Sequence, residues 1–259
     1  MSLSSSFPLI LVTNDDGIQS PGLHALAEGL RPLGDVVVVA PDRERSAVGH
    51  ALTLHAPLRA EHLRDGWVAV DGTPTDCVNL GIHGLLERRP DLVVSGINRG
   101  GNMGDDITYS GTVAAAMEAT LMGVPAFAIS LVEGPFPLEA FFPSVRVAAR
   151  VAEMILEHGI PGDTFLNVNV PRDCGNEVVF TRQGKRCYNE VVVENVDPRG
   201  RKYYWIGGGE LGFEDEAGTD FHAVMRGHVS ISPLHLDLTN YRALGQLSGW
   251  DLGDLFPGD

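Results

Sequence analysis

The chain has 259 residues, with 34 acidic and 19 basic side chains and a formal net charge of −15 at pH 7. This length suits one large α/β domain or such a domain with an appendage. The acidic balance argues against a groove that follows a polynucleotide backbone, because such grooves depend on clustered Lys and Arg.

The chain carries three cysteines, Cys77, Cys174 and Cys187, without CxxC spacing. Neither a disulfide framework nor a zinc knuckle is therefore predicted, and a reducing compartment is expected. The first residues lack the basic segment and apolar stretch of a secretory signal, and no apolar run is long enough to span a bilayer. We expect a cytoplasmic protein without a membrane partner.

Apolar runs of strand character alternate with helical stretches up to about residue 177. The predicted strands are Leu9 to Thr13, Val36 to Ala40, Leu92 to Ser95, Ala126 to Leu131 and Phe165 to Val170. The predicted helices are Pro21 to Leu30, Thr75 to Glu87, Thr112 to Met122 and Phe142 to His158. Most of the strands are continuous apolar runs, which indicates burial on both faces. The alternation predicts an α/β fold with three αβα layers and a mostly parallel sheet.

From about Val178 the pattern changes to short alternating and aromatic segments, which predict hairpins. These segments include Val191 to Val193 and Tyr203 to Trp205, and a run of three glycines at 207–209 follows them. A short helix at Thr219 to Met225, a strand at Val229 to Ser232 and a helix near Tyr241 to Leu247 are predicted to complete the chain. We expect a core that carries the functional site over residues 7–177 and a β-rich extension over 178–259. Pairing with another subunit would cover the apolar hairpins, which favours a homo-oligomer.

Polar loops follow several predicted strands, and the carboxyl ends of parallel strands share one edge of a sheet, where open α/β sheets bind ligands. Asp15 and Asp16 come directly after the first strand, Ser46 follows the second, and Asn98 follows the strand at Leu92 to Ser95. These four side chains offer only oxygen ligands, which Mg²⁺, Mn²⁺ or Ca²⁺ prefers. Adjacent carboxylates repel one another, so a cation or strong donors are expected beside them. Taken alone, Asp15 and Asp16 are equally well read as a solvated loop or a helix cap.

A phosphate site is suggested by Ser110, Gly111 and Thr112, which open an Ala-rich helix. The first N–H groups of a helix can bind an anion, and glycine permits close approach. An ordinary Ser or Thr cap explains the same residues when they are taken alone. Arg43, Arg45 and Arg99 are further candidates to neutralise phosphate, although lone loop arginines are more often solvated.

Five segments together resemble the SurE family of survival proteins, and they span nearly the whole chain. They are ILVTNDDGIQSPGLHAL, VVAPDRERSAVGHALTL, VDGTPTDCVNLG, DLVVSGINRGGNMGDDITYSGTVAAAMEA and HVSISPLHLDLT. The resemblance implies a Rossmann-like core, a protruding β-rich extension, and homodimers or homotetramers. It also implies a phosphoric monoester hydrolase that uses one divalent metal ion, Mg²⁺, Mn²⁺ or Ca²⁺, to convert nucleoside 5′- and 3′-monophosphates to nucleoside and phosphate. Short polyphosphate is an additional candidate substrate.

The resemblance assigns site residues at matching positions of this chain. It implies metal ligation by Asp15, Asp16, Ser46 and Asn98, with Asp15, Asp16 and Asn98 taking part in catalysis. On the phosphate side it implies Asn14, Asn102, Ser110, Gly111 and Thr112. We hypothesise that an Asp15 or Asp16 carboxylate helps to deprotonate the attacking water.

Three alternatives stay open at this point. A receiver-type signalling domain also carries paired acidic residues after its first strand, but the loop after Leu92 to Ser95 offers Asn98 and no phosphoacceptor Asp at the strand end. A haloacid-dehalogenase-type phosphatase needs a DxD arrangement, whereas Asp15 and Asp16 are adjacent. A nucleotide-binding or assembly protein without turnover would use the same residues, and the sequence does not exclude it.

Overall fold

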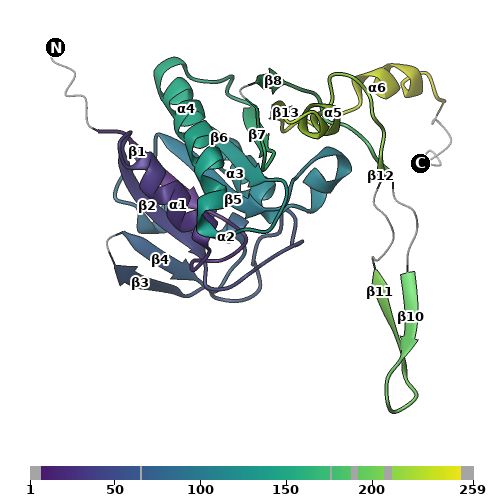
Figure 1. The fold of residues 1–259 in the computed structure, drawn as a ribbon, viewed down its shortest axis with the longest axis horizontal. Coiled ribbons are helices and arrows are strands. Elements are labelled where there is room, and N and C mark those ends of the chain that lie inside the picture. The colour runs from purple at the N-terminus through teal and green to yellow at the C-terminus, as the bar shows by residue number, and fades with distance from the viewer. Residues whose placement is uncertain (1–6, 65, 176, 188–191, 207–211, 252–259) are drawn as a thin grey trace, which may run out of the picture.

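The computed structural model describes residues 7–64, 66–175, 177–187, 192–206 and 212–251. Figure 1 shows a central sheet with helices on both faces. The strands are β1 Leu9–Thr13, β2 Asp35–Pro41, β3 Ala60–Arg64, β4 Trp67–Val70, β5 Leu92–Arg99, β6 Ala126–Leu131, β7 Thr164–Val170, β8 Val178–Phe180, β9 Arg186–Cys187, β10 Val192–Val196, β11 Lys202–Ile206, β12 Gly212–Phe213 and β13 Val229–His235. The α-helices are α1 Pro21–Leu30, α2 Pro74–Leu80, α3 Gly111–Leu121, α4 Phe142–His158, α5 Asp220–Met225 and α6 Tyr241–Leu247. Short helical turns cover η1 Gly81–Leu85, η2 Gly104–Tyr109 and η3 Leu138–Phe141.

The main sheet has nine strands in the order β3-β4-β2-β1-β5-β6-β7-β13-β8. The strands from β4 to β7 run parallel to their neighbours, whereas β3 and β13 join the sheet antiparallel. The chain passes from β1 to β2 on one side, and β5 enters on the other side of β1. This reversal creates a crevice at the carboxyl ends of β1 and β5, where α/β sheets bind ligands. The predicted α/β fold is confirmed.

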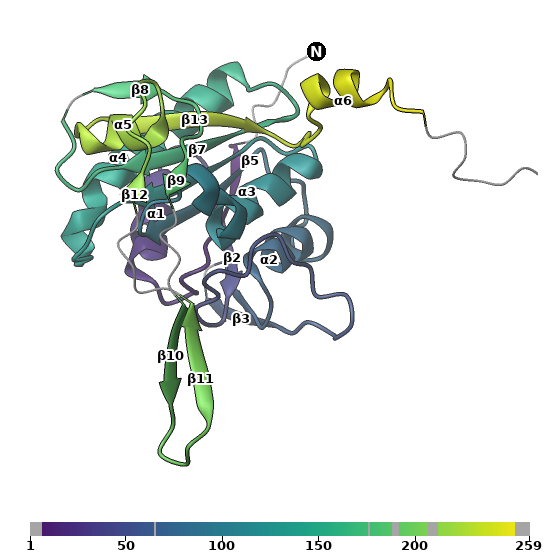
Figure 2. The same cartoon turned by 90° about the vertical axis from the view of Figure 1, so that its right-hand side faces the viewer.

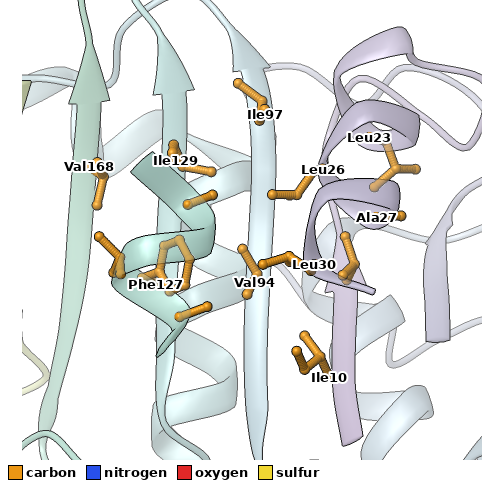
Figure 3. Packing of buried hydrophobic residues seen from close by; sticks show 14 of the residues in the cluster. Ile10, Leu23, Leu26, Ala27, Leu30, Val94, Ile97, Phe127, Ile129 and Val168 are labelled. Carbon is orange, nitrogen blue, oxygen red and sulfur yellow. The ribbon is translucent and has the colours of Figure 1, made fainter. Parts of the chain in front are cut away.

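Two apolar clusters hold the layers together. One packs α1 and α4 on one face of the sheet, with Leu26 and Phe127 fully buried. The other packs α2 and α3 on the opposite face, around Cys77 and Phe165. Figure 3 shows Ile10, Val94 and Phe127 on neighbouring strands, with Leu30 of α1 beside Val94. Burying one Leu side chain of this kind contributes about 2 kcal/mol to stability.

Helix boundaries follow their capping residues. The predicted helices at Pro21–Leu30 and Phe142–His158 match α1 and α4, and both begin with proline in the first turn. The predicted helix at Thr75 to Glu87 is too long, because α2 ends at Leu80 and a single π-helical turn follows. The strands β3 and β4 of the core sheet were not predicted; β4 is a four-residue run directly after Gly66.

The last third of the chain adds strands to the main sheet and also forms a separate hairpin. β13 pairs with β7, and β8 pairs with β13, so both extend the core sheet. In the sequence between β8 and β13, β10 and β11 form an antiparallel hairpin that protrudes from the molecule in both views (Figures 1 and 2). Val191 and the glycines 207–209 lie outside the described residues. The division at residues 177 and 178 stays a prediction. Within the described ranges, no helix has the length and apolar character needed to cross a membrane.

Candidate functional site

A cavity of about 540 Å³ opens at the carboxyl ends of β1, β2 and β5, beside the start of α3. The predicted site residues on its wall are Asp15, Asp16, Ser46, Asn98, Asn102 and Ser110. The wall also includes Glu44, Ala47, Arg99, Asp106, Tyr109 and Phe136. All four predicted metal ligands therefore border one cavity, although they come from three separate segments.

The loop after β1 is held close to the loop after β2. Arg45 donates its backbone N–H to the carbonyl oxygen of Asp15 at 2.7 Å. Gly17 adopts a φ of +92°, and a side chain there would come within 2.8 Å of the Arg43 backbone. Glycine meets both demands, since it has no Cβ and tolerates positive φ. This close approach brings Ser46 to the same cavity as Asp15.

Asp15 is buried, with 5% of its surface exposed. Its Oδ2 accepts the backbone N–H of Thr112 at 3.1 Å, and its Oδ1 accepts the Thr112 hydroxyl. Burial raises the pKa of Asp15 to about 6, and repulsion from Asp16 adds to the rise, while the Thr112 hydrogen bonds oppose it. A buried carboxylate with this pKa lacks a full positive counter-charge.

Asp16 is paired with Arg99. The Arg99 Nε donates to Asp16 Oδ1 at 2.9 Å, and its backbone N–H donates to Oδ2 at 3.2 Å. Burial nevertheless raises the pKa of Asp16 above its usual value, although Arg99 opposes the rise. The same guanidinium reaches Glu44 at 3.2 Å. Arg99 thus shares one positive charge between two carboxylates.

Ser46 and Asn98 each have an oxygen available for a cation. Ser46 donates its hydroxyl hydrogen to Glu44 at 2.7 Å, which leaves the lone pairs of its Oγ free. Asn98 donates Nδ2 to the carbonyl of Gly100 at 2.8 Å, so the amide is oriented with Oδ1 as its remaining acceptor. The pairing of β5 with β6 shifts register between Ser95 and Asn98, and such irregularities redirect side chains at strand ends.

The donor set of the cavity suits a hard divalent cation. Two carboxylates, a hydroxyl and an amide provide oxygen ligands only, as Mg²⁺, Mn²⁺ and Ca²⁺ prefer. Burial raises the pKa of both Asp15 and Asp16, and a bound cation would stabilise their charged forms. No cluster of three or more His, Cys, Asp or Glu side chains with metal-binding geometry occurs in the described part of the chain. The proposed ligands include only two carboxylates, with a hydroxyl and an amide, so they would not form a cluster of that kind.

The predicted phosphate-side residues divide into two groups. Asn102 and Ser110 line the cavity, whereas Asn14, Gly111 and Thr112 do not. Asn102 is held by the side chains of Ser130 and Asn169 at 2.9 Å each. Ser110 caps α3 by accepting the Val113 N–H at 3.1 Å.

The second group lies beside the cavity wall. Asn14 is fully buried and donates Nδ2 to the Gly17 carbonyl at 3.1 Å. Thr112 directs both its hydroxyl and its N–H to Asp15, which makes it a support for that carboxylate. Gly111 packs against Asp15, since an added Cβ would lie 3.0 Å from the Asp15 Cβ.

Several cavity residues escaped the sequence analysis. Glu44 lies two residues before Ser46, and Phe136 lies in the loop after β6. Phe136 follows the carboxyl end of a parallel strand, as the predicted loops do, so the topology offered a signal for it. Of the three candidate arginines, Arg99 borders the cavity. Arg45 binds the Asp71 carbonyl instead, and Arg43 is largely exposed beside Asp42.

Comparisons with known proteins agree with this architecture. The family model described as Survival protein SurE matches residues 10–190. The chain is 64% identical over 249 residues to a protein named 5′-nucleotidase SurE from Pelobacter propionicus, which covers 93% of this chain and 98% of that protein. A protein of the same name from Geobacter sulfurreducens is 62% identical over 251 residues, covering 96% of this chain and 95% of that protein.

A solved structure has the same fold. The crystal structure of the SurE protein from Aquifex aeolicus superposes with a TM-score of 0.81 at 46% identity, covering 93% of this chain and 98% of that one. Both the family match and the full-length identities exceed what a shared fold alone would produce. The chain belongs to the SurE family.

Proposed function

We propose that the chain is a divalent-metal-dependent phosphatase that hydrolyses nucleoside monophosphates to nucleoside and phosphate. The observation that carries this proposal is the single cavity bordered by Asp15, Asp16, Ser46 and Asn98, next to the start of α3. The relatives named 5′-nucleotidase SurE support the same reaction, which belongs to the phosphoric monoester hydrolases.

In this proposal Asp15, Asp16, Ser46 and Asn98 hold one Mg²⁺, Mn²⁺ or Ca²⁺ ion. Such an ion, when bound, polarises a phosphoryl oxygen and lowers the pKa of a bound water. The protein contributes the fixed oxygen donors, and the Thr112 hydrogen bonds keep the Asp15 carboxylate in one orientation.

The remaining residues orient the ester and handle the proton. Asn102, Ser110 and the first backbone N–H of α3 are assigned to the phosphoryl oxygens, since helix N-termini favour anions. The carboxylate of Asp15 or Asp16 accepts a proton from the attacking water. The first backbone N–H of α3 is that of Gly111, and Asn14 and Thr112 support these groups from behind. Preorganised donors of this kind supply most of the stabilisation in phosphoryl transfer.

We further propose activity on both 5′- and 3′-monophosphates, with short polyphosphate as an additional candidate. The exposed ring of Tyr109 and the ring of Phe136 border the cavity and offer stacking surfaces for a base. We also propose a homodimer or homotetramer formed through the extension at 178–259. Its hairpin exposes Trp205 and Ile206, which are 65% and 92% accessible.

The direct test measures phosphate released from 5′-AMP and 3′-AMP with Mn²⁺, with Mg²⁺, with Ca²⁺ and after chelation. Metal-dependent release from a monophosphate, lost on chelation, supports the proposal. Tight binding of AMP without release would indicate a nucleotide-binding protein instead. Stable labelling by acetyl phosphate would indicate a receiver-type domain.

A further inference from the structure

The turn η2, which carries Asp106 and Tyr109 on the cavity wall, is attached to a distant part of the chain. The backbone N–H of Gly104 donates to Asp220 Oδ2 at 2.8 Å. Gln183 donates its side-chain amide to the Gly104 carbonyl at 2.9 Å. The position of this wall therefore depends on residues that follow the predicted core.

Asp220 is the centre of this attachment. It is fully buried, and its second oxygen accepts the backbone N–H groups of Gly184 at 2.9 Å and Phe221 at 2.8 Å. Burial raises the pKa of Asp220 above its usual value, although the three N–H donors oppose the rise. One carboxylate thus joins η2, the segment before β9 and the start of α5.

Arg186 contacts the cavity turn directly. Its Nε donates to Asp106 Oδ2 at 2.9 Å, and its Nη2 donates to the same oxygen. Its backbone N–H donates to Asp105 Oδ2 at 3.0 Å. The guanidinium lies 4.8 Å from the centre of the Phe221 ring, and the side chain is only 14% exposed. These contacts fix the guanidinium in one orientation, as a planar cation on an aromatic ring prefers.

The charges of the cavity explain why this contact matters. Four acidic side chains border it, namely Asp15, Asp16, Glu44 and Asp106. Within the described residues, Arg99 is the single basic side chain on the wall, and it already pairs with Asp16 and Glu44. A phosphate monoester is a dianion near neutral pH, so the negative charge of Asp106 would repel it more strongly if the positive charge of Arg186 were removed.

We propose that Arg186 is a positioning residue of the cavity: it holds η2 in place and neutralises Asp106, so that a phosphate ester can enter. This inference rests on the proposed function. It assigns a role at the site to the segment beyond residue 177, in addition to assembly. Arg186 acts through Asp106 and needs no contact with the substrate.

The test compares steady-state kinetics of R186A, R186K and the double variant R186A/D106N with the unaltered protein, using 5′-AMP and Mn²⁺. We expect R186A to raise KM about tenfold with kcat changed less than about threefold, because the lost contact affects entry of the anion. R186K keeps the positive charge but lacks the planar guanidinium, so its KM is expected to lie between those of the unaltered protein and R186A. R186A/D106N lacks the negative charge at position 106, so its KM should return most of the way to the value of the unaltered protein. R182A is the matched control, since Arg182 pairs with Glu216 away from the cavity.

Two further measurements keep the outcome decisive. Mn²⁺ affinity, measured by electron paramagnetic resonance, should stay within about twofold in R186A, since none of the proposed metal ligands contacts Arg186. R186Q replaces R186A if the alanine variant melts at a much lower temperature. A KM unchanged in R186A, or a KM in R186A/D106N as high as in R186A, would overturn the inference. Absence of phosphate release by the unaltered protein would instead reject the proposed function.

Discussion

Thr112 binds the carboxylate of Asp15 with both of its donors, the backbone N–H at 3.1 Å and the side-chain hydroxyl. Thr112 lies in the first turn of α3, whereas Asp15 follows β1, so the pair connects the start of a helix to the end of the central strand. Burial raises the pKa of Asp15 to about 6, because its effect is larger than the opposing effect of these two hydrogen bonds. The site therefore combines rigid carboxylates with an electrostatic demand for a cation.

Replacing Asp16 by asparagine is expected to lower phosphatase activity by about 10²-fold to 10³-fold, because the variant loses a charged metal ligand. The fold should persist, since Asp16 lies in a loop at the edge of the sheet. Activity and Mn²⁺ affinity measured on D16N check this. D35N is the control, because Asp35 is exposed at the opposite end of the sheet, at the start of β2. Normal turnover by D16N with normal metal content would refute the assignment.

Stability without metal should depend on pH through Asp15. Its folded pKa of about 6 exceeds the ordinary aspartate pKa of 3.8, so the folded state binds a proton more tightly than the unfolded state. The free energy of unfolding should therefore fall as pH rises from about 4 to about 6 and carry the full penalty, at most about 3 kcal/mol, above pH 6. Urea unfolding in the presence of a chelator measures this effect.

D15N is the reference for that experiment, because it lacks the titrating group but keeps similar volume. The difference in stability between D15N and the unaltered protein should grow across this pH range, and saturating Mn²⁺ should stabilise only the protein that keeps Asp15. A difference that is the same at pH 4.5 and pH 7.5 would show that Asp15 has an ordinary pKa.

A methyl group at position 111 should disturb the metal site without unfolding the chain. An added Cβ there would lie 3.0 Å from the Asp15 Cβ and 3.2 Å from its Oδ2, so G111A pushes on the carboxylate. We expect Mn²⁺ affinity to fall about tenfold, as for other changes that disturb the support of a ligand. Calorimetric titration with Mn²⁺ measures it. G245A is the control, since among the described residues nothing beyond its own helix backbone and chain neighbours lies within 4 Å of the added atom; equal affinities in both variants would contradict the prediction.

A charge on the hairpin should separate subunits. Trp205 lies on β11 and is 65% exposed, together with neighbouring apolar side chains that a partner would bury. W205E is expected to reduce the oligomeric state measured by analytical ultracentrifugation. L138E provides the comparison, because Leu138 is an exposed apolar residue of η3, in the predicted core and outside the hairpin sequence. An unchanged mass for W205E, or an equal loss in L138E, would argue against assembly through the hairpin.

The elements with strong local signals were predictable from the sequence. The bounds of α1 and α4 follow from proline in the first turn, and Gly159 ends α4 at a positive φ. The strands β1 and β6 match their predicted bounds because both are continuous apolar runs. β3 was missed because its sequence, AEHLR, lacks the apolar run expected of a strand, and its place depends on pairing with β4.

The candidate site was predictable where it follows strand ends and unpredictable where it depends on tertiary contacts. Asp15, Asp16 and Asn98 border one cavity because their strands are neighbours in a parallel sheet. No local pattern indicated that Thr112 would serve Asp15. The link from Arg186 to Asp106 spans 80 residues, so only the folded chain reveals it.

The proposed function depends on one metal ion held by Asp15, Asp16, Ser46 and Asn98. Anomalous X-ray diffraction from crystals grown with Mn²⁺ would locate such an ion. We expect one strong anomalous peak in the cavity, with oxygen atoms of these four side chains as its protein ligands. A cavity without a peak, or a Mn²⁺ ion bound by other residues while these four side chains keep their present hydrogen bonds, would contradict it.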